Sequence, residues 1–261
     1  MDLFDADLHP LPLRRGDLAD LRFFGVTGAL ALPGASGGAT RESIRRAWDA
    51  VAGEGVRRLR RAGIAGVAAV GVDPRAIPWR GLEALLAELP DFLGRHRVVA
   101  IGAVGLEEGG PREEAVLARQ FELARELRRP VVIRTPWRAK ERITRRALAM
   151  LREHEVEAGR VLVLGADART VRMIRAFGHA AGLTLSASGA RGDALDEAVR
   201  VVRALGPEGL LLGSGAGDGP GDLLALPRAA ARMAKAGLSA AVVRRVCGGN
   251  ARALLGLGPE R

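Results

Sequence analysis

Short apolar segments alternate with longer amphipathic segments along the whole chain. The short segments have the length and composition of strands, and the longer ones repeat their apolar positions with the period of a helix. Such alternation is typical of repeated βα units on a parallel sheet. The predicted strands cover residues 4–8, 27–32, 64–72, 98–104, 131–133, 161–164, 183–186 and 210–212. Because eight strands fit a closed barrel, we expect an α/β fold, the (β/α)8 TIM barrel.

The helical segments each show one apolar face. In one of them the face runs from Ile143 through Ala147 and Met150 to His154, at steps of four, three and four. Similar faces pass through Ile44, Trp48 and Val51, and through Leu117, Phe121 and Ala124. The last segment, residues 239–255, predicts an extra C-terminal helix with Ser239 as its N-cap.

The chain is expected to form one domain, residues 1–261. Its 48% apolar content over 261 residues suffices for one large core, and barrels commonly occupy this length. No linker, charge block or low-complexity tract divides the sequence. The Gly-rich stretch at residues 33–39 predicts a mobile loop after the second strand, at the end where barrels place their sites.

The N-terminus and the cysteine content indicate a cytoplasmic protein. The first residues have no basic start followed by an apolar run, and no segment approaches the roughly 20 apolar residues of a bilayer span. We therefore expect no membrane partner. The single Cys247 cannot form an internal disulfide and has no nearby His or Cys to suggest zinc, so we interpret it as a packed thiol in a reducing compartment.

The net charge of +10, from 40 basic and 30 acidic residues, raises the question of a nucleic-acid partner. Nearly all of the basic residues are arginine, since Lys occurs only at positions 140 and 235, and the chain is rich in Ala and Gly and has no Tyr. This composition is typical of proteins encoded by a GC-rich genome, so the positive charge is weak evidence for a polyanionic partner. Pairs such as Arg57-Arg58 and Arg145-Arg146 fall in helical segments, where they indicate a solvated outer face, and we do not expect nucleic acid as the partner.

The first strand carries the densest polar pattern of the chain. In Asp5-Ala6-Asp7-Leu8-His9 the polar residues are spaced by two, which predicts that their side chains share one strand face while Ala6 and Leu8 take the other. Burying carboxylates without partners is costly, so such a triad inside a barrel needs a reason. It indicates either a metal or catalytic site or a structural Asp–His hydrogen-bond cluster.

The other strand ends, where barrels place reactive groups, provide no imidazole. They fall at Ala103, Arg134, Gly165, Ser214 and Gly215. His96 precedes the fourth strand and belongs to the opposite end, and His154 and His179 lie in helical segments, so all three are interpreted as structural. Ser214 lacks a nucleophile-elbow context, and the chain has neither a Walker loop nor a dinucleotide-binding fingerprint.

Several motifs at the strand ends resemble those of one family over nearly the whole chain. They are FDADLH at the first strand, VVAIGAVGLE at the fourth, FELARELRRPVVIRTP into the fifth, DARTVRMI after the sixth, AAGLTLS at the seventh and GPEGLLLGSGAGDGPGDLLALP around the eighth. The last is the most specific, because its Ser-x-Ala-Gly-x-Gly-Pro-x-Asp frame is intact. The chain thus resembles the TatD-like metal-dependent hydrolases of the amidohydrolase superfamily, barrels similar to phosphodiester- and amide-cleaving enzymes.

The resemblance implies metal ligands that are mostly absent from this chain. The family's first-strand His-x-His corresponds to Asp7-Leu8-His9, which leaves His9 as a ligand and Asp7 as a further oxygen donor. The bridging Glu of strand 4, the His of strand 5, the His of strand 6 and the Asp of strand 8 correspond to Ala103, Arg134, Gly165 and Gly215. Two protein ligands fall short of the three or four that zinc sites use, so we expect no metal cofactor.

The chemistry of these replacements points the same way as the count of ligands. Hydrolysis in such a site relies on a metal that lowers the pKa of bound water and on an acid that accepts the proton. Gly215 replaces that acid, and Arg134 places a fixed positive charge where a cation would lie. We therefore expect a TatD-like homologue that has lost its metal site, a pseudoenzyme that binds a ligand or a protein partner.

Two other functional classes remain open. One is a hydrolase with altered chemistry, acting on a phosphoester or amide substrate through Asp7, His9 and Asp218, with or without one weakly held divalent metal. Asp218 is included among these candidates because it lies in the loop after the eighth strand, from which its carboxylate could reach the barrel mouth. The other is a nucleic-acid-associated protein that uses its positive surface.

The predicted ligand is a small anion bound at the barrel mouth. Arg134 would anchor it, because a guanidinium offers a fork of donors matched to phosphate or carboxylate, and Arg138, Lys140 and Arg191 are expected in loops of the same end. Asp5, Asp7, His9 and Ser214 complete the predicted ligand-binding set. The alternative is that Arg134 only neutralises Asp7 or Asp5 inside the emptied pocket.

Overall fold

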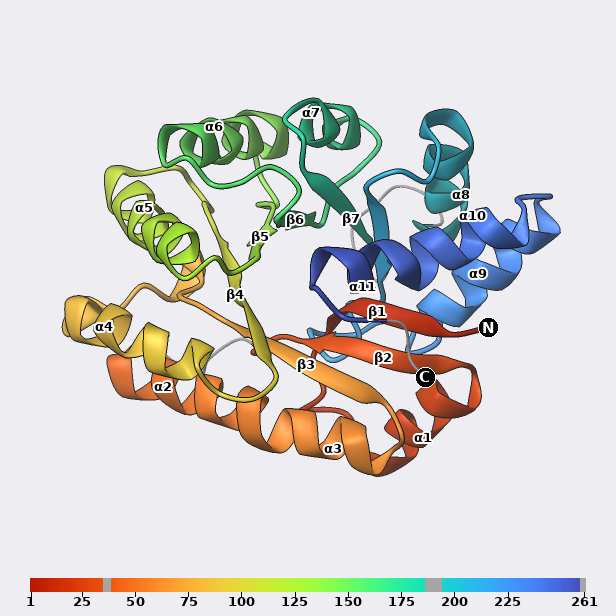
Figure 1. Ribbon diagram of the computed structural model, residues 1–261, viewed down its shortest axis with the longest axis horizontal. Helices are drawn as coiled ribbons and strands as arrows, with labels where there is room; N and C mark the ends of the chain where they lie inside the picture. Colours follow the sequence, from red (N-terminus) through yellow and green to blue (C-terminus); the bar gives the residue numbers. More distant parts are fainter. Residues whose placement is uncertain (35–38, 186–193, 259–261) are drawn as a thin grey trace.

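Eight parallel strands form one sheet in the order of the sequence, and helices surround it (Figure 1). The structure is a computed structural model and describes residues 1–34, 39–185 and 194–258. The strands are β1 (Leu3–Leu8), β2 (Val26–Ala31), β3 (Ala65–Val70), β4 (Val98–Gly105), β5 (Val131–Arg134), β6 (Val161–Leu164), β7 (Ala180–Thr184) and β8 (Leu210–Gly213). The predicted (β/α)8 barrel is confirmed.

The seventh strand begins three residues before its predicted start. Prediction placed it at residues 183–186, but β7 starts at Ala180, and residue 186 lies outside the described residues. Ala180, Ala181 and Gly182 have low strand propensity, so a search for β-prone residues misses them. Pairing with the neighbouring strands places these residues in β7, because Ala180 pairs with Leu162 of β6 and Ala181 with Leu210 of β8. The other strands differ from prediction by one or two residues at their ends.

The helices lie outside the strands on several sides of the barrel. They are α1 (Arg15–Phe23), α2 (Arg41–Ala50), α3 (Val56–Arg61), α4 (Leu82–Leu93), α5 (Pro111–Glu126), α6 (Lys140–Glu153), α7 (Thr170–Ala176), α8 (Ala194–Leu205), α9 (Ala225–Lys235), α10 (Ala240–Arg244) and α11 (Asn250–Leu254). Helices α2 and α3 lie opposite α6 and α7 (Figure 1). None of these helices in the described part of the chain is both long and apolar enough to cross a membrane.

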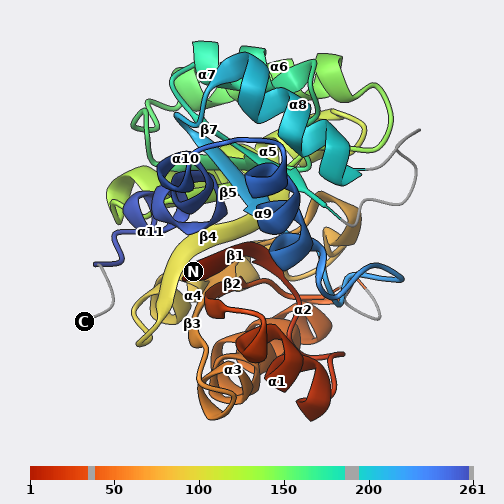
Figure 2. The ribbon, with the colours of Figure 1, turned by 90° about the vertical axis from the view of Figure 1, so that its right-hand side faces the viewer.

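The C-terminal segment begins as predicted but is not one continuous helix. The Ser239 side chain accepts a hydrogen bond from the N–H of Val242 at 3.3 Å, which confirms it as an N-cap. A wider π turn, Arg245–Gly249, then separates α10 from α11, and Gly248 within it has non-helical torsion angles. The segment lies beside β1 (Figures 1 and 2).

Apolar side chains pack in two layers, one on each side of the strands. The inner layer fills the barrel with residues such as Phe4, Val67, Val132 and Leu211, and Ala251 of α11 packs against it. The outer layer joins the strands to the helices. The barrel is therefore a solid core rather than a pore.

The barrel closes through a short contact between β8 and β1. Leu8 and Ala216 form an isolated parallel bridge, in which the N–H of His9 donates to the carbonyl of Ala216 at 2.9 Å. The N–H of Gly215 donates to the carbonyl of Asp7 at 2.8 Å. This seam holds the polar residues of the first strand beside the loop after β8.

Candidate functional site

The polar residues of β1 do not share one face as the spacing predicted. Ala6 packs in the inner layer and Leu8 in the outer layer, so these two residues do not face the same way. The reason is a bulge: the pairing of β1 with β2 shifts register between Asp5 and Leu8. A bulge breaks the period of two on which the prediction rested and aims side chains at the end of the strand differently.

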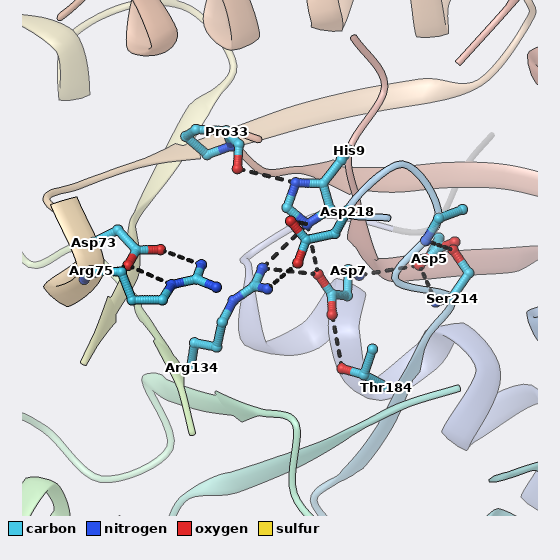
Figure 3. Close-up of polar contacts among 11 residues, drawn as sticks. Asp5, Asp7, His9, Pro33, Asp73, Arg75, Arg134, Thr184, Ser214 and Asp218 are labelled. Carbon is cyan, nitrogen blue, oxygen red and sulfur yellow. Dashed lines mark hydrogen bonds and ion pairs between the residues drawn. The ribbon is translucent and has the colours of Figure 1, made fainter. Parts of the chain in front are cut away.

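Asp5 lies at the seam between β1 and β8 and does not reach the barrel mouth. Its Oδ1 accepts the N–H of Ser214 at 2.8 Å and the N–H of Asp7 at 3.1 Å (Figure 3). The carboxyl is fully buried and its Oδ2 has no hydrogen-bond partner. Burial raises the pKa of Asp5 to about 6, despite the opposing hydrogen bonds from Ser214. Asp5 therefore joins the two strands and is not positioned to contact a ligand.

Asp7 is the central acid of the mouth. Its Oδ2 accepts the hydroxyl of Thr184 at 2.8 Å, and its Oδ1 lies 3.6 Å from Nη2 of Arg134 and 3.4 Å from Nε2 of His9. Burial opposes ionisation of Asp7, but the charge of Arg134 and the hydrogen bond from Thr184 lower its pKa to about 2. Asp7 is therefore ionised at neutral pH.

Both ring nitrogens of His9 contact groups of the protein. Its Nδ1 lies 3.0 Å from the carbonyl oxygen of Pro33, and because a carbonyl only accepts, Nδ1 carries the proton. Nη2 of Arg134 lies 3.2 Å from Nε2, and because a guanidinium only donates, Nε2 is the acceptor. The lone pair that would bind a metal ion is thus used by Arg134.

Arg134, at the end of β5, joins the other charged groups of the mouth. Besides His9 and Asp7, its guanidinium contacts Asp218, with Nη1 2.5 Å from Oδ2 (Figure 3). Burial lowers the pKa of Arg134, but Asp7 and Asp218 together raise it above its ordinary value, so the group remains a cation. The internal ion pair considered as an alternative exists in this structure, with Asp7 and Asp218 as partners rather than Asp5.

The other three positions at which the resemblance implies metal ligands, Ala103, Gly165 and Gly215, have no donor atoms in their side chains. Ala103 has only a methyl group, and Gly165 and Gly215 have φ values of +72° and +68°. This left-handed region favours glycine, and a Cβ on Gly165 would stand 2.7 Å from Oγ1 of Thr135. The backbone at positions 165 and 215 is therefore suited to glycine and strained for the His and Asp implied by the resemblance.

Two cavities open at this end of the barrel, and Arg134 lines both. The first, of about 190 Å³, lies among the ends of β5, β6, β7 and β8 and is called the β5–β8 cavity; Asp7, Lys140, Asp167, Glu197 and Asp218 are among its lining residues. The second, of about 170 Å³, lies among β2, α2, β3 and β4 and is called the β2–β4 cavity; Trp48, Asp73, Arg75 and Ala103 line it. The mouth is thus divided in two.

The predicted site residues are only partly brought together. Asp7, Arg134, Gly165, Gly215 and Asp218 line the β5–β8 cavity, whereas Asp5, His9 and Ser214 line neither cavity. Ser214 is fully buried, and its Oγ accepts the N–H of Ala216 at 3.0 Å. Lys140 lines the β5–β8 cavity and Arg138 is exposed, while Arg191 and residues 35–38 of the Gly-rich loop lie outside the described residues.

Sequence reasoning missed Thr184, Asp73 and Arg75. Thr184 ends β7, and the Asp73-Pro74-Arg75 segment follows β3 closely, so the rule that selected Arg134 would have found all three. Nε and Nη2 of Arg75 donate to the two carboxylate oxygens of Asp73 at 3.0 and 2.7 Å. This pair borders the β2–β4 cavity.

The remaining histidines and Cys247 lie away from the mouth. His179 precedes β7 at the opposite end of the barrel and is buried, and burial lowers its pKa to about 4. His154 follows α6, with Nδ1 3.7 Å from Glu122. Cys247 is buried, which raises the pKa of its thiol to about 12. These groups contribute nothing to the candidate site.

The fold and the strand-end site together define a class of protein, the TIM barrels of the amidohydrolase type. A family model described as TatD related DNase matches residues 53–251, and the chain belongs to that family. An uncharacterized metal-dependent hydrolase of Methanocaldococcus jannaschii is 30% identical over 191 residues, which cover 73% of this chain and 74% of the relative. The expected relationship to TatD-like hydrolases is confirmed.

Solved structures agree with this assignment. A TatD-like protein of Archaeoglobus fulgidus is similar with a TM-score of 0.81 and 25% identity, over 97% of this chain and 100% of that one. A phosphotriesterase homology protein of Escherichia coli, described as complexed with phosphate in its active site, is similar with a TM-score of 0.74. Its identity is 17%, over 97% of this chain and 98% of that one, so this likeness concerns the fold alone.

The residues present do not fit the metal centre that the family implies. In residues 1–34, 39–185 and 194–258, no three His, Cys, Asp or Glu side chains are grouped to hold a metal ion. Nε2 of His9 accepts from a guanidinium, which also lies against Asp7. The guanidinium of Arg134 therefore lies at the point where these two donors face each other.

The contacts of Asp7 predict the effect of its removal on stability. Asp7→Ala would leave Thr184 without its acceptor and would remove one of the two acids that neutralise Arg134. We expect a loss of about 1–3 kcal/mol in the free energy of unfolding, measured by urea denaturation at pH 7. Asp20→Ala, at an exposed position of α1, is the control and should change it by less than about 0.5 kcal/mol. A neutral or stabilising effect of Asp7→Ala would indicate that Asp7 is kept for function at a cost in stability.

The raised pKa of Asp5 predicts a pH dependence of stability. Between its unfolded value of 3.8 and its folded value of about 6, the folded state holds a proton that the unfolded state has released. Stability therefore falls as the pH rises through this window. Asp5→Asn keeps an acceptor oxygen but does not titrate. From pH 4 to pH 7 the wild type should therefore lose roughly 2 kcal/mol of unfolding free energy relative to the variant. Urea titrations at both pH values measure it, and a constant difference would contradict the prediction.

Proposed function

We propose that this TatD-family barrel binds a small anion at its mouth and does not hydrolyse substrates through a metal-bound water. The observation that carries the proposal is the position of the Arg134 guanidinium. It donates to Nε2 of His9 and pairs with Asp7 and Asp218, which supplies a permanent positive charge among these groups. Nε of the same guanidinium is buried and has no hydrogen-bond partner among the described residues, so one donor remains for an anion without a metal.

The same contacts leave no residue of this cluster ready for hydrolysis. A general base must reach the proton that it abstracts. Both nitrogens of the His9 ring are engaged, Asp7 accepts from Thr184, and Asp218 is paired with Arg134. A protein whose polar groups are occupied in this way is suited to binding rather than to proton transfer.

The β2–β4 cavity is the part of the mouth best suited to the anion. Its described lining contains Arg75, Arg134 and a single carboxylate, Asp73, so cations exceed anions there by one. Asp73 already binds Arg75 through both oxygens, and the charge of Arg75 disfavours the protonated form of Arg134. An anion placed between the two guanidinium groups would relieve this repulsion and receive donors from both.

The walls of this cavity limit the size and character of the anion. Ala103 stands where the resemblance implies a bridging Glu, so one negative charge and its side-chain volume are absent. Ile44, Ala47 and Trp48 of α2 provide apolar surface, and the indole N–H of Trp48 donates to the carbonyl of Gly71 at 2.9 Å. In about 170 Å³, the cavity suits a small carboxylate or phosphate with a short apolar group.

The altered hydrolase remains the second candidate, because one observation favours it. Oxygens of Asp7 and Asp218 lie 3.4 and 3.9 Å from Nε2 of His9, so the three proposed catalytic groups do converge. Acid–base work would require Arg134 to leave Nε2 when substrate binds. A panel of phosphodiester, nuclease and amide substrates, assayed with and without added divalent metals, separates this candidate from the binding protein.

The metal content of the purified protein is the first test of the proposal. We expect no stoichiometric zinc, manganese or iron, because positions 103, 165 and 215 lack donors and Arg134 occupies the lone pair of His9. Elemental analysis of protein purified without chelator measures this directly. About one tightly held ion per chain would overturn the proposal, and Asp7→Ala and His9→Ala would then identify the ligands.

Thermal unfolding with added anions is the second test. An anion present at about ten times its Kd stabilises a protein by about 1.4 kcal/mol, or roughly 3–5 °C in Tm at this chain length. We expect phosphate or a small carboxylate to raise the Tm of the wild type but not that of Arg134→Ala.

A second variant guards against a general effect of losing Arg134. Arg75→Gln leaves the contacts of Arg134 with Asp7 and Asp218 in place, and should also weaken the response to anions. Arg57→Gln removes an equal charge from an exposed residue of α3 and should not. If millimolar anions leave the wild-type Tm unchanged, only the internal ion pair remains, and a protein partner becomes the better assignment.

A further inference from the structure

The β5–β8 cavity carries the opposite charge from the β2–β4 cavity. Among the residues that the structure describes, four carboxylates line it, those of Asp7, Asp167, Glu197 and Asp218, against the two cations Lys140 and Arg134. The cavity therefore has a surplus of two negative charges in a chain whose net charge is +10. Such a local reversal of sign concentrates cations and repels anions at this part of the mouth.

The two cations of this cavity are already engaged by the protein. Arg134 contacts Asp7, Asp218 and His9, as described above. Nζ of Lys140 donates to the carbonyl of Gly165 at 2.8 Å and lies 3.9 Å from Oδ2 of Asp167. Glu197 accepts the N–H of Ala168 through Oε1 and has no ion-pair partner among the described residues. The negative surplus is therefore not neutralised by groups of the described chain.

A buried acid provides a second and independent sign of a missing partner. Asp7 lines the cavity with a side chain that is only 3% exposed, and its Oδ1 has no hydrogen-bond donor. Nε2 of His9 and Nη2 of Arg134 lie 3.4 and 3.6 Å from this oxygen, beyond good hydrogen-bond length. Leaving a buried carboxylate oxygen without a donor costs free energy that a ligand N–H would recover.

The rest of the cavity wall is apolar. Leu164, Leu183, Leu185 and Ala198 line it, together with the ring of Trp137, which is 60% exposed. A ligand for this site thus needs a small apolar body as well as a positive charge. A primary ammonium supplies three donors on one atom, which suits separate carboxylates better than a planar group does.

We propose that the β5–β8 cavity is a second ligand site, which binds a protonated primary amine with a short apolar chain. Its carboxylates and its apolar wall recognise the two parts of that ligand. This site is independent of the anion proposed for the β2–β4 cavity, because different residues and the opposite charge define it. Of the charged residues in the described part of the chain, only Arg134 lines both cavities.

The three tryptophans allow each cavity to be observed separately. Trp137 lines the β5–β8 cavity, Trp48 lines the β2–β4 cavity and Trp79 lines neither. In a ¹H–¹⁵N correlation spectrum their indole N–H signals can be assigned with single Trp→Phe variants. Titration with n-butylammonium at pH 7 should shift the signal of Trp137 saturably and leave that of Trp79 unchanged. Butyrate and n-butanol, which keep the chain but change or remove the charge, should not shift the Trp137 signal.

Variants then test whether the carboxylates of this cavity cause the binding. Glu197→Gln keeps the acceptor for Ala168 but removes one charge, and should weaken n-butylammonium binding about three- to fivefold. Glu208→Gln makes the same change at an exposed residue next to β8 at the opposite end of the barrel, and should leave the affinity unchanged.

Four outcomes would overturn the amine site. They are no shift of Trp137 with n-butylammonium, a larger shift with butyrate, an equal shift with n-butanol, and equal weakening by Glu197→Gln and Glu208→Gln. An equal shift with n-butanol would mean that apolar contact alone causes the signal change. Equal weakening by the two variants would mean that the general charge of the surface causes the binding. Failure of the anion proposal would appear instead as an unresponsive Trp48 signal during titration with phosphate, so the two failures are distinguishable.

Discussion

The contact of the Arg134 guanidinium with His9, Asp7 and Asp218 organises the mouth of this barrel. A buried guanidinium is tolerated when its charge is neutralised by nearby acids. Arg134 meets this condition through two acids from different parts of the chain, one at the end of β1 and one in the loop after β8. In turn it keeps Asp7 ionised and takes the lone pair of His9. Removal of Arg134 would leave Asp7 and Asp218 without their shared cation.

This cluster explains how a TatD-family barrel accommodates Ala103, Arg134, Gly165 and Gly215 at its strand ends. Those positions lie at the carboxyl ends of the strands, whereas the inner and outer apolar layers lie between and around the strands. Loss of donors at positions 103, 165 and 215 therefore leaves the core intact. An unpaired buried carboxylate at Asp7 would be destabilising, and the guanidinium of Arg134 supplies its counter-charge. The same residue divides the mouth into two cavities whose charged linings differ in sign.

Much of the fold could be predicted from the sequence, because its pattern is local. Apolar runs of the right length identify strands, and seven of the eight predicted strands match within about two residues at each end. The seventh strand and the C-terminal segment are the exceptions. Small residues such as Ala180 take strand conformation only because neighbouring strands pair with them, and Gly248 interrupts a helix whose apolar period runs on across the break.

The sequence by itself determined the barrel, its family resemblance and the identity of the residues at most strand ends, because these depend on periodicity and on residue type. It also left His9 as the one residue that the resemblance keeps at a ligand position, with Asp7 as a further possible oxygen donor. Only the tertiary structure decided that a bulge in β1 turns Asp5 away from the mouth, that Arg134 pairs with Asp218 eighty-four residues later, and that Asp73 and Arg75 border a separate cavity. Residues distant in sequence meet only when the barrel closes, and their charges and hydrogen bonds have no signature in the local pattern of the chain.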